Sequence, residues 1–441
     1  QGLSSPRQAR RGNLIGAVGM LVAVVGTLIL AEIVDYRWIA AGLVIGSLIG
    51  AAMAIWIPMT KMPERIALSH SFGGLAAALV GVAEYIHRGG GLDRFTMGAL
   101  GFEVFFGFLT FTGSLMAFGK LQGLISGAPI TYKGQNASNV GLFFLALVLL
   151  VLIVAEPSRS ALFYLMGAIG LAVGVLAVLP IGGADMPVVI SLLNSYAGLA
   201  AAATGFALGN YVLIIAGALD GTSGFLLSLK MSQAMNRSFG NVLFGAFGGT
   251  AEAGGAGPAG AAANYNLATV EDATGVLQAA QSVIIVPGYG MAVSQAQHTV
   301  AELAQALEAN GARVKYAIHP VAGRMPGHMN VLLAEANVPY DQLYDLEDIN
   351  DEFARTDVAL VVGANDVVNP AAKNTPGSPI YGMPVFNVDE ARTAIVLKRS
   401  MNPGFAGIEN ELFVQPNTMM VLGDAKKTLR EFIAGVKAEA A

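Results

Sequence analysis

Three polar side chains lie inside long apolar segments, where hydrocarbon disfavours them. His70 lies one or two helical turns into one such segment, and Ser114 and Asn194 lie at a comparable depth in two others, roughly 7–10 Å from the end at 1.5 Å per residue. An imidazole titrates near neutral pH, and a hydroxyl and an amide at the same level can extend a relay. Because ionisable groups inside membrane segments usually mark a functional path, we predict proton transfer through these residues, with His70 titrating.

The polar residues of these apolar segments could also have structural roles. Ser114 and Asn194 could instead hold helices together, as small and polar side chains commonly do in membrane bundles. Glu84, Glu103 and Glu32 lie near the opposite ends of their segments. There they are either wetted structural groups or part of a proton exit.

A basic cluster ends a short apolar run in the last third of the chain. The run Thr393–Lys398 is followed by Arg399 and Ser400, so two cations and a hydroxyl meet at a predicted strand end. Such groups suit a 2′-phosphate, because they form charge-assisted hydrogen bonds to its oxygens. The predicted strand Arg313–His319 ends without the acidic residue that binds a ribose 2′-hydroxyl in NAD sites. We therefore predict NADP(H) rather than NAD(H), the alternative being a merely solvated strand end.

A glycine-containing turn follows the apolar run Ser282–Pro287, and a helical stretch continues from it to Asn310 before Gly311. Glycines let backbone N–H groups approach a pyrophosphate at a helix N-terminus, which predicts a dinucleotide site. The turn alone is a weak signal, because many strand-to-helix turns contain glycine and its last residue replaces the usual third glycine or alanine. The turn residues are Gly288, Tyr289, Gly290, Met291, Ala292 and Val293.

The sheet that would position these groups is predicted from short apolar runs that alternate with helical stretches. This alternation is typical of a doubly wound parallel sheet, in which ligands bind at the carboxyl ends of the strands. Two loops, His319–His328 and Gly363–Pro370 with its continuation to Pro379, are predicted to be lids or else ordinary long loops. The strands predicted after Ser282–Pro287 are Arg313–His319, Asp357–Gly363, Pro384–Phe386, Thr393–Lys398 and Thr418–Leu422.

Apolar segments of the first half are long enough to cross a bilayer, which takes about 20 residues. Their even number places both ends of the bundle on one side, where loop cations such as Lys61, Lys120 and Lys230 gather. The positive-inside rule makes that side cytosolic. The spans, about eight of them, are predicted at Asn13–Val34, Trp38–Ile57, Glu64–Ile86, Met97–Gly119, Val140–Ala155, Ala161–Leu179, Pro187–Leu208 and Asn210–Leu229.

Composition agrees with two physically different halves. The chain has 441 residues, of which 54% are apolar and 12% charged, and most charges follow Glu271. A soluble globule rarely has so few charges, so part of the chain must meet lipid. The net charge of -5, with no basic stripe, argues against a nucleic-acid partner. The sequence has no cysteine, which excludes disulfides, thiolate metal sites and cysteine nucleophiles.

Residues 239–268 are rich in glycine and alanine and predict a flexible tether. The predicted organisation is therefore a transmembrane domain at 1–238, this linker, and a nucleotide-binding domain at 269–441. The predicted fold class is multi-domain: a polytopic α-helical membrane bundle followed by a C-terminal α/β doubly wound, Rossmann-like domain.

Several long motifs resemble those of proton-translocating NAD(P) transhydrogenases, and together they cover nearly the whole chain. In the C-terminal part the similar segments are Pro287–Gln297, His319–His328, Gly363–Pro370 and Lys398–Asn402. In the membrane half they are His70–Phe72, Thr110–Ser114, Gly182–Pro187 and Asn194–Tyr196. The chain is similar to the beta subunit of that family, which combines its second and third domains.

This resemblance implies a function. The enzyme would pass a hydride between NAD(H) on a partner subunit and NADP(H) on this chain, coupled to proton movement, with no flavin and no metal. The implied partner is an alpha subunit that carries the NAD(H)-binding domain and additional transmembrane helices, within a dimer of protomers. The implied location is a bacterial inner membrane, with the C-terminal domain cytoplasmic. A different class remains as an alternative, namely a channel or secondary transporter gated by a nucleotide-binding domain.

The resemblance also implies site residues. His70, Ser114 and Asn194 match proton-transfer positions, Asp185 an acidic position at the cytosolic edge, and Asp366 an acid suspected in coupling. The family binds its nucleotide reversed relative to ordinary Rossmann domains. Family beta subunits usually carry one more helix before the segment that begins here at Gln1, so this chain is either incomplete or without that helix. The chain also carries Phe405 where tyrosine is common. The implied nucleotide-binding residues are Gly288, Tyr289, Gly290, Met291, Ala292, Val293, Arg324, Gly363, Ala364, Asn365, Asp366, Lys398, Arg399, Ser400, Gly423 and Asp424.

Overall fold

The protein is represented by a computed structural model. It describes residues 6–29, 36–88, 91–127, 130–182, 185–235, 239, 265–325, 327–376, 378, 380–404 and 406–439. Gln1, Glu32, Val34, Pro379 and Phe405, which the sequence analysis named, lie outside these residues, and so does part of the segment Gly182–Pro187.

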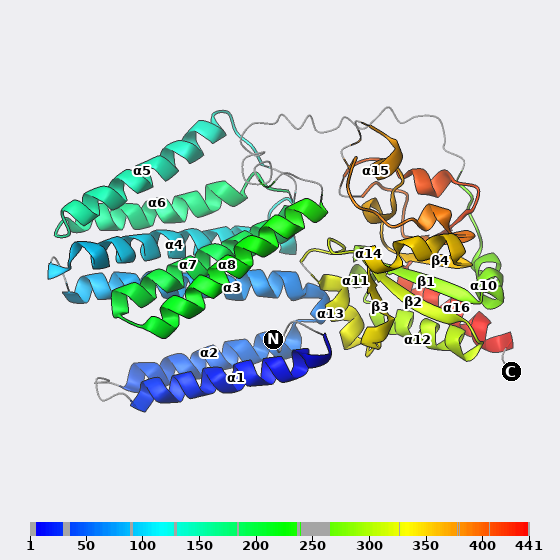
Figure 1. Ribbon diagram of the computed structural model, residues 1–441, viewed down its shortest axis with the longest axis horizontal. Helices are drawn as coiled ribbons and strands as arrows, with labels where there is room; N and C mark the ends of the chain where they lie inside the picture. The colour runs from blue at the N-terminus through cyan, green and yellow to red at the C-terminus, as the bar shows by residue number, and fades with distance from the viewer. Residues whose placement is uncertain are drawn as a thin grey trace.

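In the described part of the chain, eight apolar helices form the N-terminal bundle (Figure 1). Among the described residues, seven of them, α2 to α8, are long and apolar enough to cross a membrane, and α1 contributes a shorter apolar stretch, Arg11–Gly26. This agrees with the predicted number of about eight spans. The helices are α1 Pro6–Ile29, α2 Tyr36–Trp56, α3 Met62–Arg88, α4 Arg94–Gln122, α5 Gln135–Ala155, α6 Ser160–Val178, α7 Met186–Leu208 and α8 Tyr211–Ala234.

Helices α4 and α7 are the most enclosed helices of the bundle. Glycine allows the closest contacts between helices: a Cβ atom on Gly198 of α7 would lie 2.2 Å from the backbone nitrogen of Gly221 on α8. Small residues at such contacts let helix backbones approach each other, which drives association where lipid offers no hydrophobic gain.

The C-terminal part contains a parallel sheet that, among the described residues, has six strands in the order β3-β2-β1-β4-β5-β6. The doubly wound Rossmann-like prediction is thereby confirmed. The strands are β1 Ser282–Pro287, β2 Arg313–Ile318, β3 Leu343–Asp345, β4 Val358–Val362, β5 Thr393–Lys398 and β6 Thr418–Leu422. The accompanying helices are α10 Val270–Ala279, α11 Tyr289–Val293, α12 Gln297–Ala309, α13 His328–Glu335, α14 Leu346–Ile349, α15 Ala371–Asn374 and α16 Ala425–Glu439.

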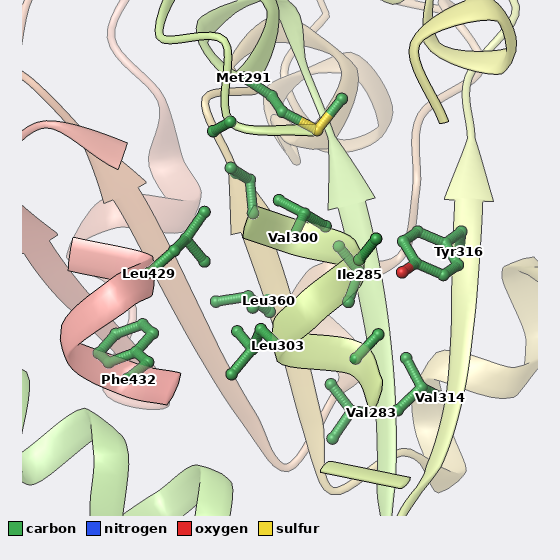
Figure 2. Close-up of a cluster of buried hydrophobic side chains, with 14 of the residues drawn as sticks. Val283, Ile285, Met291, Val300, Leu303, Val314, Tyr316, Leu360, Leu429 and Phe432 are labelled. Carbon is green, nitrogen blue, oxygen red and sulfur yellow. The ribbon is translucent and has the colours of Figure 1, made fainter. Parts of the chain in front are cut away.

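Large aliphatic and aromatic side chains fill the layer between the sheet and the helices α12 and α16. Ile285 on β1, Leu303 on α12 and Phe432 on α16 are each completely buried there (Figure 2). Full burial of one such side chain is worth about 1.5–3 kcal/mol. The apolar runs of the strands predicted a sheet covered on both faces. On this face their side chains stabilise the packing of the sheet against α12 and α16.

One predicted strand of this domain was wrong, and one strand was missed. Pro384–Phe386 is not a strand: Pro384 has no N–H to donate, and β4 already lies between β1 and β5. The segment is buried all the same, and the N–H of Phe386 donates to the Val367 carbonyl. Strand β3 was missed because its three residues form no buried apolar run.

The glycine turn Gly288–Val293, predicted to precede the helical stretch to Asn310, itself contains the short helix α11. It is separated at Ser294–Ala296 from the predicted helix, which is α12. The Ser294 hydroxyl donates to the Gly290 carbonyl at 2.8 Å, and Gln295 has a positive φ of 51°. A short polar side chain that bonds the backbone competes with the helical pattern, which explains the break.

The predicted linker lies outside the described residues from 240 to 264. Its last residues, 265–268, run alongside the edge strand β6, where Leu267 pairs with Met420. The Ala268 N–H donates to the Met420 carbonyl at 3.0 Å, and the Met420 N–H donates to Asn266 at 2.8 Å. This end of the segment is therefore hydrogen-bonded to the sheet.

Candidate functional site

A cavity of about 490 Å³ opens at the carboxyl ends of β1, β4 and β5. The strand order reverses between β1 and β4, which is where doubly wound folds place their ligands. Its lining residues are Met235, Gly288, Tyr289, Gly290, Ser294, Val321, Ala322, Gly323, Gly363, Ala364, Asn365, Asp366, Val367, Ile380, Met383, Leu397, Lys398, Arg399, Ser400, Asn402, Pro403, Gly404, Ala406, Gly423 and Ala425.

Bare backbone forms one wall of the cavity, because two glycine turns touch each other. A Cβ atom on Gly288 would lie 2.4 Å from the Ala364 nitrogen, and one on Gly290 would lie 2.7 Å from the Gly363 Cα. The N–H groups of Gly288 and Gly290 donate to the carbonyls of Val362 and Gly363, both at 2.9 Å. These glycines therefore join the ends of β1 and β4 and leave room for a ligand close to the main chain.

Only part of the predicted turn faces the cavity. Gly288, Tyr289 and Gly290 line it, whereas Met291 and Ala292 are buried in the hydrophobic layer beneath and Val293 is exposed. The sequence motif thus identified a turn that lines the cavity, while the helical rotation of α11 directs its last three side chains elsewhere.

The basic cluster forms the opposite wall. Lys398, Arg399 and Ser400 all line the cavity, and the Lys398 Nζ donates to the Asn402 carbonyl at 2.9 Å. Burial lowers the pKa of Lys398, and the nearby Asp366 carboxylate partly offsets this by raising it. A partly desolvated cation at this position attracts an anionic ligand more strongly than one in bulk water.

Asp366 also organises the loop that carries the cluster's neighbours. Its Oδ2 atom accepts the Ala406 N–H at 3.0 Å, and a Cβ atom on Gly404 would lie 2.4 Å from its Oδ1. Asn410 donates to the Asn365 carbonyl at 3.0 Å, so the two adjacent residues both hold this loop. The predicted residues Gly363, Ala364, Asn365 and Asp366 therefore all lie at the cavity.

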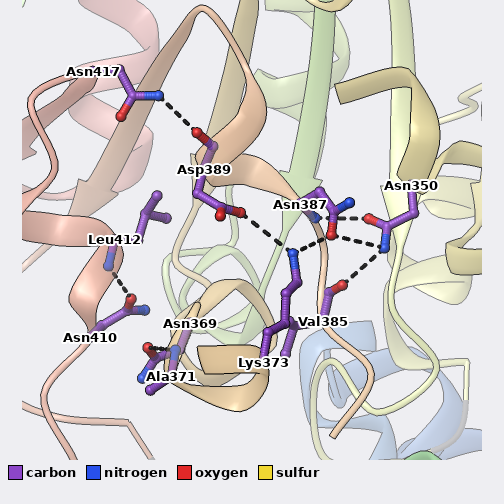
Figure 3. Close-up of polar contacts among 10 residues, drawn as sticks. All are labelled: Asn350, Asn369, Ala371, Lys373, Val385, Asn387, Asp389, Asn410, Leu412 and Asn417. Atoms are coloured by element: carbon purple, nitrogen blue, oxygen red, sulfur yellow. Dashed lines mark hydrogen bonds and ion pairs between the residues drawn. The ribbon is translucent and has the colours of Figure 1, made fainter. Parts of the chain in front are cut away.

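The segment after Asp366, predicted to be either a lid or an ordinary long loop, is packed against the rest of the domain. Asn369 donates to the Glu409 carbonyl at 3.1 Å. Lys373 forms an ion pair with Asp389 at 3.6 Å (Figure 3). Within this segment, the side chains of Val367, Val368 and Ala371 are buried. This part of the cavity rim is consequently a folded element with its own core contacts.

Arg324 lies outside the cavity lining and contacts the membrane bundle. Its Nη1 donates to the Leu121 carbonyl at the end of α4 at 2.7 Å and lies 3.7 Å from Glu64 at the start of α3. The guanidinium also lies over the Tyr289 ring, 4.5 Å from its centroid. The loop 319–328 thus lies between the cavity, which Val321 helps to line, and the bundle.

Of the last two residues predicted to bind nucleotide, Gly423 lines the cavity and Asp424 does not. The Oδ1 atom of Asp424 accepts the Lys427 N–H at 3.1 Å at the start of α16. Such a bond is typical of a helix N-cap, so the residue has a sufficient structural role.

In the bundle, the structure brings His70 and Ser114 together and gives Asn194 a different partner. The His70 Nδ1 lies 3.0 Å from the Ser114 hydroxyl, and its Nε2 is buried with no hydrogen-bond partner in the described part of the chain. Asn194 donates to Asp220 of α8 at 3.2 Å. Asp185 is the residue that precedes the first turn of α7.

Asp220 is a residue that the sequence analysis missed. It lies in the middle of the apolar helix α8, and its charge acts electrostatically on His70. An acidic residue inside a predicted span was the available signal, because such groups are rarely placed there without a function. Asp220 therefore extends the His70 and Asn194 group onto a third helix.

Comparison with known proteins covers nearly the entire chain. The family model for the NAD(P) transhydrogenase beta subunit matches residues 1–435. Two similar relatives, both NAD(P) transhydrogenase subunit beta from Rhodospirillum rubrum, are each 50% identical over 446 residues, which covers 98% of this chain and 95% of the relative. The chain belongs to the NAD(P) transhydrogenase beta subunit family.

Proposed function

We propose that the cavity at the ends of β1, β4 and β5 binds NADP(H). As a transhydrogenase beta subunit, the chain acts with an alpha subunit and with both NADP(H) and NAD(H), in an enzyme that couples hydride transfer to proton translocation. This membership disfavours a channel or transporter gated by a nucleotide-binding domain. In this multi-pass membrane protein, the cavity would bind the nucleotide and polar groups of the bundle would move the proton.

The cavity residues suit a dinucleotide that carries an extra phosphate. The wall at Gly288, Gly290 and Gly363 lines the cavity without side chains, so a pyrophosphate can approach the main chain closely. Lys398, Arg399 and Ser400 supply cations and a hydroxyl for a 2′-phosphate. When bound, the nicotinamide supplies the carbon that gives or accepts the hydride, while the protein orients it and excludes water.

The neighbouring strand supports NADP(H) over NAD(H). Strand β2 is followed by His319, whose Nε2 lies 2.8 Å from the Pro384 carbonyl and whose Nδ1 accepts the Val321 N–H at 3.2 Å. No acidic side chain follows β2 before Pro320 to take a ribose 2′-hydroxyl. The polar group at this strand end is thus occupied in bracing the loop 319–328.

For the proton path we propose that His70 gains and loses a proton at Nε2, which has no hydrogen-bond partner among the described residues. Ser114 holds the other ring nitrogen, and Asn194 with Asp220 forms the adjoining polar pair. At the proposed cytosolic ends of the helices, Val321 packs against the cluster of Val188 on α7 and Met231 on α8. A change of proton occupancy can thereby bias the cavity between closed and open states, with Asp185 and Asp366 as coupling residues.

We further propose direct hydride transfer without flavin or metal, with NAD(H) on the alpha subunit. That subunit would also supply additional transmembrane helices, within a dimer of protomers. The cations at the ends of the spans favour a bacterial inner membrane in which the C-terminal domain is cytoplasmic.

Calorimetric titration of the full-length chain in detergent with NADPH and with NADH tests the nucleotide assignment. The cationic wall at Lys398 is the observation that carries it. We expect tight binding of NADPH alone, and Lys398→Ala should weaken it by about 10- to 100-fold, because a hydrogen bond to a charged group is worth about 1.5–3 kcal/mol. Arg392→Ala removes an equally charged but exposed side chain paired with Asp357 and should have no effect. Equal affinity for NADH would contradict the proposal.

A further inference from the structure

We propose that Glu103 of α4 is a second proton-binding site, on the opposite side of the bundle from His70. The inference rests on the proposed proton path and extends it. Glu103 is completely buried, and neither carboxylate oxygen has a hydrogen-bond partner within the part of the chain that the structure describes. An isolated carboxylate ion is strongly disfavoured in such surroundings, whereas a neutral carboxylic acid is tolerated. A Glu103 oxygen therefore holds a proton.

The neighbouring helix provides space for this carboxyl group. A Cβ atom on Gly81 of α3 would lie 3.0 Å from the Glu103 Cδ and 3.2 Å from its Oε1. The same atom would also meet the Val104 side chain at 2.8 Å. Glycine at position 81 thus leaves a notch that the acid fills, so the carboxyl group belongs to the helix contact and does not merely project into lipid.

The charged and titratable groups around Glu103 lead toward one end of the bundle. Glu84 of α3 acts on it electrostatically, and Thr204 of α7 is its other polar neighbour. Glu84 forms an ion pair with Arg88 at 2.5 Å, one turn nearer the end of α3. Tyr85 of α3 is engaged elsewhere, because its hydroxyl donates to the Pro157 carbonyl at 2.9 Å. The Glu84–Arg88 pair therefore connects the buried acid to the aqueous end.

A tight helix contact separates this acid from the histidine. Ser114 follows Glu103 by 11 residues, which is about 16 Å along α4 at 1.5 Å per residue. Between the two levels, a Cβ atom on Gly107 would lie 2.8 Å from the Ala78 nitrogen, so α3 and α4 are in backbone contact. Thr110 lies on the same face of α4 as Gly107. Its hydroxyl is buried and neither donates nor accepts a hydrogen bond among the described residues. One proton-binding group therefore lies on each side of this close contact between α3 and α4.

The proton balance is simple. Glu103 releases its proton to water at the Glu84–Arg88 end and becomes a carboxylate. It returns to the neutral acid by accepting a proton that arrives from the His70 side, and the reverse sequence operates when the reaction runs backward. No oxidant or reductant takes part in either step.

The test uses the complete enzyme, with its alpha subunit, reconstituted in vesicles. Proton uptake is followed with a pH-sensitive dye during coupled turnover, beside hydride exchange between NADH and an oxidised NAD analogue through NADP(H) that stays bound. Glu103→Gln should lower proton translocation and coupled turnover by roughly a hundredfold. It should leave the exchange reaction within about twofold of wild type, because that reaction needs no net proton step. Glu103→Asp should restore part of the coupled rate with a displaced pH profile.

Glu156→Gln is the matched control, because Glu156 lies at the same end of the bundle in an exposed ion pair with Arg159. It should pump like wild type. Wild-type pumping by Glu103→Gln would overturn the proposal and leave the nucleotide assignment intact. Failure of the wild type itself to pump would reject the proton path and this site together. Infrared spectroscopy gives an independent measure: the carbonyl stretch of a protonated acid should shift in Glu103→Asp, and an unchanged spectrum would also overturn the proposal.

Discussion

The sheet and the bundle bury their functional groups in opposite ways. The sheet packs large side chains such as Ile285 and Phe432 in its interior and gathers glycines and cations at one end, around a cavity of about 490 Å³. The bundle packs small residues such as Gly74 and Gly107 between helices and places His70 within the helix contacts themselves. A nucleotide needs a built cavity, whereas a proton needs only one buried atom with a suitable neighbour.

This difference has a consequence for substitutions. A change in the cavity wall should affect a ligand that is recognised by many atoms, so each contact contributes a fraction of the affinity. A change at a proton site removes the only group that can hold the proton. Defects should therefore be graded in the sheet and nearly complete in the bundle.

The largest effect is expected for His70→Asn. An amide can keep the hydrogen bond to Ser114, but it cannot titrate. Coupled turnover and proton translocation in reconstituted vesicles should fall by roughly 100-fold or more. NADPH binding by calorimetry should stay within about twofold, because His70 does not line the cavity. Intact pumping in this variant would show that His70 is not the proton-binding group of the bundle.

Acid should loosen the sheet domain before the bundle. Burial lowers the pKa of His319 to about 4, against the hydrogen bond to Pro384, which raises it. Burial likewise lowers the pKa of His328 to about 4. The folded state prefers both rings neutral, so their stability is fully present above the unfolded pKa of about 6.5 and is lost as the pH falls from there toward 4. The loss for His319 should be about 1 kcal/mol at pH 5.5 and roughly 3 kcal/mol below pH 4.

Differential scanning calorimetry of the full chain between pH 7 and 4 measures this loss. His319→Gln should give a flatter pH dependence for the transition of the sheet domain. His298→Gln, which changes an exposed histidine on α12, should keep the wild-type slope. A transition that does not move with pH in the wild type would show that the His319 surroundings tolerate the charged ring.

Much of this sheet could be predicted because its strands are short apolar runs bounded by turn residues. Five of its strands were located within one residue or so, whereas β3 was missed because it lacks a buried run. Pro384–Phe386 has strand composition, but its burial comes from packing against the segment at Val367. Hydrophobic pattern predicts burial more reliably than it predicts strand pairing.

The site could be predicted in part. The glycine turn and the cluster at Lys398 follow from local sequence, because strand ends in a parallel sheet meet at one edge. The partners of Arg324 and Asn194 depend on contacts with residues more than 20 positions away, 203 positions in the case of Leu121. Such pairings are set by tertiary packing, and local motifs carry no information about them.

The contact between the two regions predicts an intermediate effect. Arg324→Gln and Glu64→Gln each remove one side of the ion pair that joins the loop 319–328 to α3. Each should lower coupled turnover by about fivefold, and the double variant should be no worse, because the pair couples by about 1 kcal/mol. NADPH affinity decides between docking and nucleotide binding for Arg324. If Arg324→Gln lowers the affinity for NADPH and Glu64→Gln does not, Arg324 takes part in nucleotide binding.

The smallest effect is expected at Asp424, and it defines where the cavity ends. Asp424→Ala removes the bond to the Lys427 N–H at the start of α16 and should cost about 1 kcal/mol of stability, while Asp424→Asn, which can also cap the helix, should cost little. Neither should change the affinity for NADPH, because Asp424 does not line the cavity although its neighbour Gly423 does. Thermal unfolding and NADPH titration of the same samples separate the two effects. A drop in NADPH affinity for both variants would extend the site beyond Gly423 to the helix terminus, and unchanged affinity with a lower melting temperature for Asp424→Ala would confine the residue to capping.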